Sequence, residues 1–136
     1  MKKVVNTITQ DEKNLDFDRV RSVRFWKDGL MITDLNGEVF NLSNKEYDTD
    51  IIFKGVVVDH NFLYVDNSKR FINLDFVKNV KTEIAPASDT YAVKILFEGD
   101  GVEVFNCSSE KETMDLKKHI LKEKEKQTTQ DAGLTQ

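Results

Sequence analysis

Short runs of β-branched and aromatic residues, separated by turn-forming residues, most restrict what this chain can fold into. Arg19–Trp26 is such a run and ends at Lys27-Asp28-Gly29, while Leu30–Leu35 and Glu38–Ser43 follow with Asn36-Gly37 between them. Asn-Gly between two such runs is the strongest short-range signal for a β-hairpin, because a two-residue type I′ turn needs positive φ angles. The sequence therefore predicts consecutive antiparallel strands here.

A two-residue loop at this hairpin sets a definite strand register. It pairs Thr33 with Phe40 and Met31 with Leu42. Since paired residues share a face of the sheet, the side that carries Met31, Phe40 and Leu42 is predicted to face the core.

The middle of the chain has a different pattern, with apolar runs that do not alternate with polar residues. These runs lie at 51–53, 56–58, 62–65 and 71–72. Continuous apolar runs of this kind are typical of strands that are buried on both faces of a sheet. A buried helix is the alternative, and the β-branched content and the turn-like segments at 59–61 and 66–69 favour strands.

Three short blocks of sequence occur twice in the same order. Two valine–cation phrases, VRSVR and VKNVK, each follow an Asn-Leu-Asp-Phe block. A Phe-Asn pair occurs further along in both copies, and in this alignment Leu42 corresponds to Cys107. The copies lie at 14–17 and 73–76, at 20–24 and 77–81, and at 37–43 and 101–108. Most of the difference in spacing falls in the loop at 85–90, which contains Pro86. The pattern predicts an internal duplication of a β-meander unit, with halves at about 14–50 and 71–126.

Only the second half ends in a clear helical pattern. Ser109 and Glu112 have the spacing of a capping box. Behind them, an apolar stripe at helical spacing predicts a helix over about 110–125; its members are Thr113, Met114, Leu116, Ile120 and Leu121. Residues 127–136 have no packing face and are predicted to form a flexible tail, after a single β-rich domain at 1–126.

The predicted fold is mostly β with one C-terminal helix, and about seven antiparallel strands form a sandwich or a partly open barrel. The end of the chain, with strands at 71–74, 77–84, 91–98 and 102–107 before the capped helix, resembles pleckstrin-homology-like domains. The resemblance covers about residues 15–122 and implies a protein-interaction scaffold. Lipid-binding members carry a cluster of Lys and Arg in the first hairpin loop, whereas Lys27-Asp28-Gly29 offers one lysine. Phosphoinositide binding is therefore not carried over.

Composition narrows the classes of function. The 136 residues suit one domain, and the net charge of −4 gives no long-range attraction to nucleic acid or anionic lipid. No apolar run approaches 18 residues, so no membrane association is predicted. With Cys107 as the single cysteine, a cytoplasmic location is expected. One proline, nine phenylalanines and many Asn, Asp and Lys residues are typical of phages, mobile elements and low-GC bacteria.

Residues that could carry chemistry are scattered. His60 and His119 have no second ligand at metal-binding spacing, and Cys107 reads as a small core residue. No nucleophile elbow, phosphate-binding glycine loop or dinucleotide motif is present. We therefore expect no metal, no cofactor and no enzyme activity.

The candidate binding residues lie in the valine–cation phrases and directly beside the first of them. Valines three positions apart cannot share a face of a regular strand, so either a β-bulge or a turn-to-strand entry is predicted at this point. Either arrangement would turn both valines inward, and the cations would take equivalent outward positions in the two copies, Arg21 with Lys78 and Arg24 with Lys81. The predicted partner-binding residues are Arg19, Arg21, Arg24, Trp26, Lys78 and Lys81.

Three functions stay open at this point. The first is a non-enzymatic module that binds a protein partner and that could also form a homo-oligomer through a strand edge. It fits an accessory or host-modulating protein of a phage or mobile element. The second is a nucleic-acid-binding protein that uses the basic strands and Trp26. The third is a small enzyme without a recognisable motif.

Overall fold

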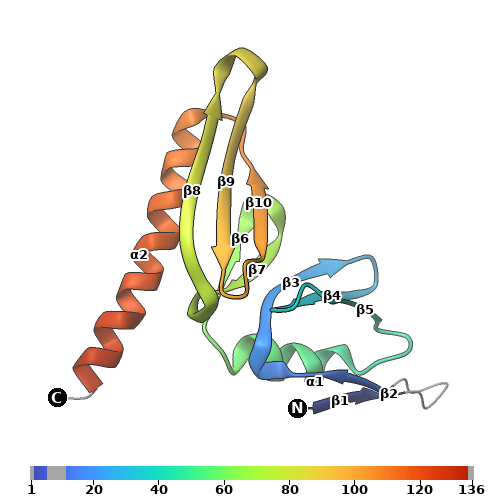
Figure 1. Cartoon of the computed structure of the whole chain (residues 1–136). Coiled ribbons are helices and arrows are strands. Elements are labelled where there is room, and N and C mark those ends of the chain that lie inside the picture. The colour runs from blue at the N-terminus through green and yellow to red at the C-terminus, as the bar shows by residue number, and fades with distance from the viewer. Residues whose placement is uncertain (1, 6–11, 135–136) are drawn as a thin grey trace. The chain divides into compact units, whose positions relative to one another are not determined.

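The computed structural model describes the backbone of residues 2–5 and 12–134, and the side chains of Val4 and of residues 12–126. It divides into two compact units, Met1–Asn73 and Leu74–Gln136, which are described one at a time. Each unit contains an antiparallel sheet, and no sheet of the described residues closes into a barrel (Figure 1). The predicted mostly β class with a C-terminal helix is confirmed.

A five-stranded antiparallel sheet forms the centre of the first unit. Its strand order is β5-β4-β3-β7-β6, so that β3 is the middle strand. The strands are β3 (Val20–Trp26), β4 (Gly29–Asp34), β5 (Val39–Ser43), β6 (Phe62–Val65) and β7 (Arg70–Asn73). A separate pair, β1 (Lys2–Val5) and β2 (Glu12–Leu15), precedes them and was not predicted. The one-turn 3-10 helix η1 (Phe17–Arg19) joins β2 to β3.

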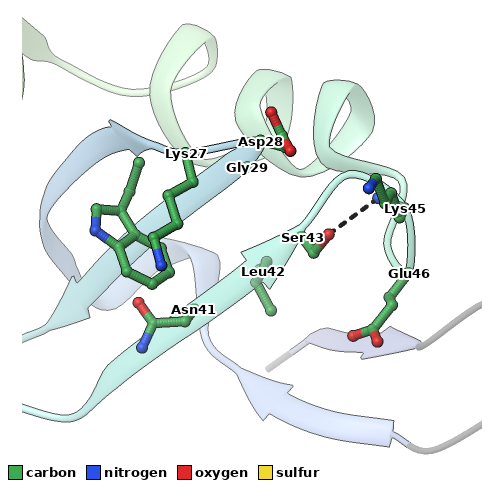
Figure 2. A pocket seen from close by; sticks show the side chains of 9 residues that line it. Lys27, Asp28, Gly29, Asn41, Leu42, Ser43, Lys45 and Glu46 are labelled. Carbon is green, nitrogen blue, oxygen red and sulfur yellow. Dashed lines mark hydrogen bonds between the residues drawn. The ribbon is translucent and has the colours of Figure 1, made fainter.

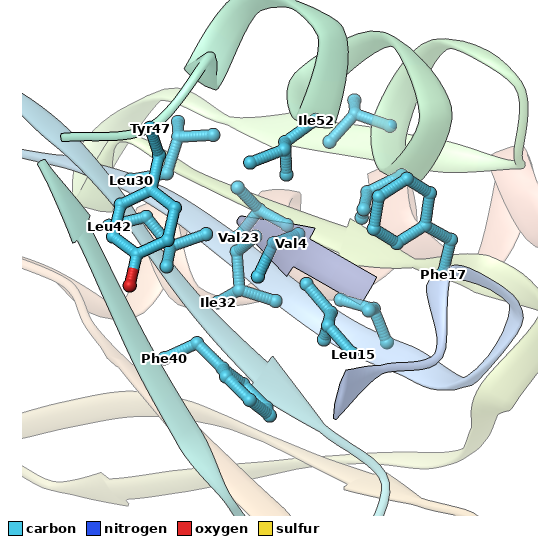
Figure 3. Close-up of a cluster of buried hydrophobic side chains, with 13 residues drawn as sticks. Val4, Leu15, Phe17, Val23, Leu30, Ile32, Phe40, Leu42, Tyr47 and Ile52 are labelled. Carbon is cyan, nitrogen blue, oxygen red and sulfur yellow. The ribbon is translucent and has the colours of Figure 1, made fainter. Parts of the chain in front are cut away.

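One face of this sheet carries the hydrophobic core of the unit (Figure 3). Strands β3, β4 and β5 contribute buried aliphatic and aromatic side chains, and residues of β1, β2, η1 and the segment 47–57 cover them. The members are Val4, Leu15, Phe17, Val20, Val23, Leu30, Ile32, Phe40, Leu42, Tyr47, Ile52, Val56 and Val57. The β2 and η1 members lie within the repeated Asn-Leu-Asp-Phe block, which accounts for the apolar residues in that block.

The Asn36-Gly37 hairpin exists, but the predicted register is wrong by one residue. Asp34 N–H donates to Glu38 O at 3.0 Å, which leaves a three-residue loop. Gly37 takes φ +84° in that loop, and the Asp34 carboxylate accepts the N–H groups of Asn36 and Glu38. Leu30 therefore pairs with Leu42 and Ile32 with Phe40. The core side carries these four residues, and Met31 lies on the other face.

The strands predicted at 51–53 and 56–58 are wrong, because both segments are helical. Helix α1 (Thr49–Phe53) continues into the π-helical turn η2 (Lys54–Val58). Asp48 caps the start by accepting the Ile51 N–H at 3.3 Å. The buried residues Ile52, Val56 and Val57 fall at the spacing of one helical face, whereas Ile51 and Val58 are exposed. The cap and this spacing outweigh the β-branched content that favoured strands. The strands predicted at 62–65 and 71–72 are confirmed.

The predicted bulge is present at the start of β3. Val20 pairs with Asp34 and Ser22 with Thr33, so that Arg21 is the extra residue. Both Val20 and Val23 are buried as a result. The buried Asn73 side chain donates through Nδ2 to Val20 O at 3.0 Å, which gives this bulge-site carbonyl a partner from β7.

The second unit is a three-stranded antiparallel meander with order β10-β9-β8 and one long helix. The one-turn helix η4 (Leu74–Phe76) leads into β8 (Val77–Ala85). Strands β9 (Thr90–Phe97) and β10 (Val102–Asn106) complete the sheet, and the short 3-10 helix η5 (Pro86–Ser88) forms the connection predicted around Pro86.

The same bulge recurs in β8. Val77 pairs with Phe97 and Asn79 with Leu96, so that Lys78 is the extra residue, and both Val77 and Val80 are buried. Here the small polar residue of the phrase supplies the hydrogen bond, because Asn79 Oδ1 accepts the Val80 N–H at 2.8 Å. Each valine–cation phrase therefore encodes a bulged strand start.

The long helix α2 (Glu110–Leu134) packs against β8 and β9 of its own unit (Figure 1). Ser109 Oγ accepts the Glu112 N–H at 3.1 Å, as the capping box predicts, and the Glu112 carboxylate accepts the Ser108 N–H instead of that of Ser109. Thr113 and Ile120 are buried, while Met114 and Leu121, which were predicted in the stripe, are exposed.

The backbone of α2 extends beyond the predicted end at about 125. A flexible tail at 127–136 stays a prediction, because the side chains from residue 127 onward lie outside the described residues.

The two meanders also share their second hairpin loop. Phe97 N–H donates to Gly101 O and Asp100 N–H to Phe97 O, which repeats the pattern of Asp34, Glu38 and Gly37. This register places Phe105 opposite Val93, as Leu42 lies opposite Leu30. The predicted equivalence of Cys107 and Leu42 is therefore displaced by two residues, and Cys107 is half-buried instead of a core residue.

A substitution at Gly29 tests whether the close approach of β4 and β5 contributes to stability. A Cβ at this position would lie 1.9 Å from Leu42 O, a backbone atom that cannot move without breaking the strand pairing. We expect Gly29→Ala to lower the free energy of unfolding by about 3 kcal/mol. Chemical denaturation followed by circular dichroism measures this. Gly37→Asn is the control, since that site is open and Asn tolerates positive φ, so a change within about 0.5 kcal/mol is expected. Equal losses would refute the close-approach explanation.

Deleting Lys78 tests the bulge. Without the extra residue, either Val77 or Val80 must turn to the exposed face, which costs about 2 kcal/mol for one lost buried valine. Lys78→Ala keeps the extra residue and removes only an exposed ion pair with Asp100, so it should change stability by less than about 0.5 kcal/mol. Denaturant titration of both variants decides. A deletion variant as stable as the wild type would show that the bulge does not set the register.

Candidate functional site

The turn between β3 and β4 presents two aromatic side chains on opposite faces of the five-stranded sheet. Trp26 pairs with Gly29, and Lys27-Asp28 form the connection, with Lys27 at φ +51°. Because side chains alternate along a strand, Phe25 lies on the core face and Trp26 on the other. Both remain in contact with water, since Phe25 is 56% and Trp26 39% exposed.

On the Trp26 face, a hollow of about 210 Å³ lies beside the turn (Figure 2). Its other lining residues include Asn41, Ser43 and Lys45. The Lys27 Nζ lies 4.5 Å from the centre of the indole ring, a cation–π arrangement. In Figure 2 the side chains of Lys27 and Asp28 leave the turn in opposite directions.

On the core face, four rings form what we call the aromatic cluster: Phe25, Phe53, Tyr64 and Phe71. The Phe25 and Phe53 rings stack at 5.5 Å, and Phe71 meets them edge-on at 5.8 and 5.3 Å. Tyr64 lies 4.7 Å from Phe71 and is 40% exposed. Strands β3, β6 and β7 and helix α1 each supply one ring, so the cluster depends on the tertiary fold.

Beside the cluster lies a groove of about 420 Å³, which we call the acidic groove. Phe25 and Phe53 form its aromatic lining, and its charged lining residues are Lys27, Asp28 and Asp50; Gly29, Leu30, Asn44 and Thr49 complete it. A neighbouring hollow of about 560 Å³ shares Asn44, Thr49 and Asp50 with it and adds Tyr47 and Asp48.

Four of the predicted binding residues fall in the first unit and do not form one patch. Arg19 is exposed in η1, and Arg21 is half-buried at the bulge. Arg24 and Trp26 share the face of the sheet opposite the core, where Arg24 is half-buried. Only this last pair combines a cation with an aromatic ring on one face.

The other two predicted residues, Lys78 and Lys81, lie in β8 of the second unit. Both are exposed, Lys78 Nζ is 3.8 Å from Asp100 Oδ1, and Lys81 lies opposite Lys94 in the sheet. The sequence prediction that they take positions equivalent to Arg21 and Arg24 agrees with the registers of β3 and β8.

Sequence reasoning missed the aromatic cluster and Arg70. Arg70 pairs with Arg24 across β3 and β7, so that two cations face each other on the side of the sheet that carries Trp26. The signal that could have found the cluster is the helical spacing at 49–57, which removes Phe53 from the predicted strands and places it on a helix over the sheet.

The residues considered as metal ligands or nucleophiles do not form a site. His60 Nε2 lies 2.9 Å from Asp18 Oδ1, a contact that ties the end of η2 to η1. Cys107 Sγ lies 3.8 Å from Phe105 O. Within residues 2–5 and 12–134, no group of three or more His, Cys, Asp or Glu side chains could hold a metal ion. No helix in that part of the chain is both long and apolar enough to cross a membrane.

Comparison with protein-family models, with curated proteins and with solved structures gave no match to this chain. The geometry described above is therefore the basis for a functional proposal.

Proposed function

We propose that this chain is a non-enzymatic protein-binding module that docks its partner on the aromatic cluster. The main observation in support of this proposal is that Phe25 is 56% exposed, although its ring stacks on Phe53 and contacts Phe71. Exposed aromatic groups gathered beside a groove are typical of protein-interaction sites, whose binding energy concentrates in a few aromatic anchors.

The arrangement of the cluster supports this proposal in a second way. Phe53 and Phe71 are only partly buried and pack against the hydrophobic core, which holds these two rings in position. A side chain already held in its bound position loses less conformational entropy when a partner arrives. A preorganised aromatic surface can therefore bind tightly with a small contact area.

Phe25→Ser tests the proposal. Wild-type and variant proteins serve as baits in lysates of the source cells, and bound proteins are quantified by mass spectrometry and then purified. We expect a partner that the wild type binds at equimolar ratio in calorimetry and that Phe25→Ser binds at least about 10-fold more weakly. Val39→Ser is the control, because Val39 is 49% exposed on the opposite face of the same sheet and should leave binding unchanged.

Circular dichroism must show that both variants fold. If every bound protein is retained equally by the wild type, Phe25→Ser and Val39→Ser, the aromatic cluster is not the docking surface and the proposal fails.

A second candidate function is nucleic-acid binding through the other face. The observation that favours it is the register pairing of Arg24 with Arg70 on the face that carries Trp26, because two guanidinium groups on one face can bind a phosphate and the indole can stack a base. The net charge of −4 opposes it.

Oligonucleotide titration decides this candidate. Fluorescence of Trp26, the only tryptophan, is followed with single-stranded and duplex DNA at low and moderate ionic strength. If this face binds nucleic acid, quenching falls as salt rises and Arg24→Gln weakens binding about 10-fold, while Arg19→Gln, at an exposed cation in η1, has a smaller effect. No quenching with either nucleic acid would eliminate it.

The further sequence predictions concern the setting of the protein. We infer a cytoplasmic accessory protein of a phage or mobile element, without cofactor and without enzyme activity, in which two meander units derive from one. The matching bulges and hairpin loops of β3–β5 and β8–β10 support this last inference.

A further inference from the structure

We propose that the acidic groove accepts an arginine or lysine side chain from a basic segment of the partner protein. This inference rests on the proposed protein-binding function, because it concerns the groove beside the aromatic cluster. It adds the chemistry of the bound segment, which the cluster alone does not define.

The aromatic lining suits a cation. The Phe25 and Phe53 rings stack at 5.5 Å with an interplanar angle of 20°, and both line the groove. A guanidinium or ammonium group is attracted to the face of such a ring by the ring quadrupole. The guanidinium is the more weakly hydrated of the two and therefore loses less on leaving water. The aliphatic part of the same side chain covers the exposed surface of Phe25.

The charges of the groove favour the same occupant. Of its three charged lining residues, Asp28 and Asp50 are carboxylates and Lys27 is a cation. The Lys27 ammonium, however, lies 4.5 Å over the Trp26 ring, whose side chain belongs to the opposite face of the sheet. The two carboxylates are therefore the charges that remain for the occupant of the groove, and the N–H groups of an arginine guanidinium can donate hydrogen bonds to them.

The neighbouring hollow extends the acidic character along the surface. Its residues Tyr47, Asp48 and Asp50 continue from the groove through the shared Asn44 and Thr49. Asp48 accepts the Ile51 N–H as the cap of α1, whereas Asp50 is exposed in the first turn of that helix. A segment with more than one cation therefore finds more than one carboxylate.

Other occupants fit less well. An acidic segment would face Asp28 and Asp50 as like charges, which costs binding energy at close range. A purely apolar segment would cover the same carboxylates without a partner, and a buried unpaired charge is costly. The aromatic cluster alone would admit both, so the carboxylates provide the selectivity.

The test uses the full chain and defined probes. A fluorescein-labelled peptide in which arginine alternates with serine is titrated by fluorescence anisotropy, together with counterparts that contain lysine or glutamate in place of arginine. We expect saturable binding of the arginine and lysine peptides and none of the glutamate peptide. Asp28→Asn and Asp50→Asn should each weaken arginine-peptide binding about 2- to 5-fold, and Phe25→Ser about 10-fold.

Glu38→Gln is the matched control, because it removes one exposed carboxylate at the other end of the β4 strand, in the hairpin that leads into β5. The net charge of −4 attracts any cationic peptide weakly, and this attraction should change equally in every charge variant. A specific groove site instead distinguishes Asp28→Asn and Asp50→Asn from Glu38→Gln.

Two results would overturn the inference. One is no saturable binding of either cationic peptide, and the other is equal affinity among the wild type, both aspartate variants and Glu38→Gln. Either result leaves the proposed function standing if a purified partner still depends on Phe25. Binding of the glutamate peptide that depends on Phe25 would likewise reject the cationic occupant while it supports the docking surface.

Discussion

A single extra residue at the start of the central strand determines how the first unit is built. Arg21 forms a bulge in β3, and without it Val20 and Val23 could not both enter the core. The cost of a bulge is a disturbed hydrogen-bond ladder, and the buried Asn73 side chain offsets it by donating to Val20 O from the adjacent strand. Since β3 pairs with β4 on one side and β7 on the other, the position of all five strands follows from this point. In the second unit the side-chain hydrogen bond at the bulge lies within β8 itself, where Asn79 Oδ1 accepts the Val80 N–H.

The parts of the fold that sequence could predict are those governed by neighbouring residues. Turn residues located the hairpins, the valine spacing located both bulges, and Ser109 located the start of α2. The failures have a different origin. Three loop residues instead of two at Asn36-Gly37 depend on how Asp34 uses its carboxylate, and this moved the register by one. At 51–58, β-branched residues suit both a strand and a well-packed helix. The Asp48 cap and the helical spacing of the buried residues favour the helix. Gly55 also suits it, because a Cβ at that position would lie 2.7 Å from the Phe17 ring.

The candidate site was harder to predict than the fold because proximity in space decides it. The sequence predicts that the cations of the two phrases form the binding site. In the structure these cations lie in two different units, and those of the first unit lie in different environments. The aromatic cluster instead takes one residue each from β3, α1, β6 and β7. Trp26, two residues beyond the first phrase, is among the binding residues that the sequence predicts. Phe25, its neighbour, is not, because its importance depends on Phe53 and Phe71.

The close approach of β4 to β5 at Gly29 also limits how the surface around the indole can change. Trp26 stands opposite a residue that can carry no side chain, so no cross-strand partner can be provided for its ring from that position. Substitution can still alter what the hollow accepts at its polar and charged lining positions, which are Lys27, Asp28, Asn41, Ser43, Lys45 and Glu46. Variation in recognition on this face is therefore confined to a few positions, while the backbone beneath them stays constant.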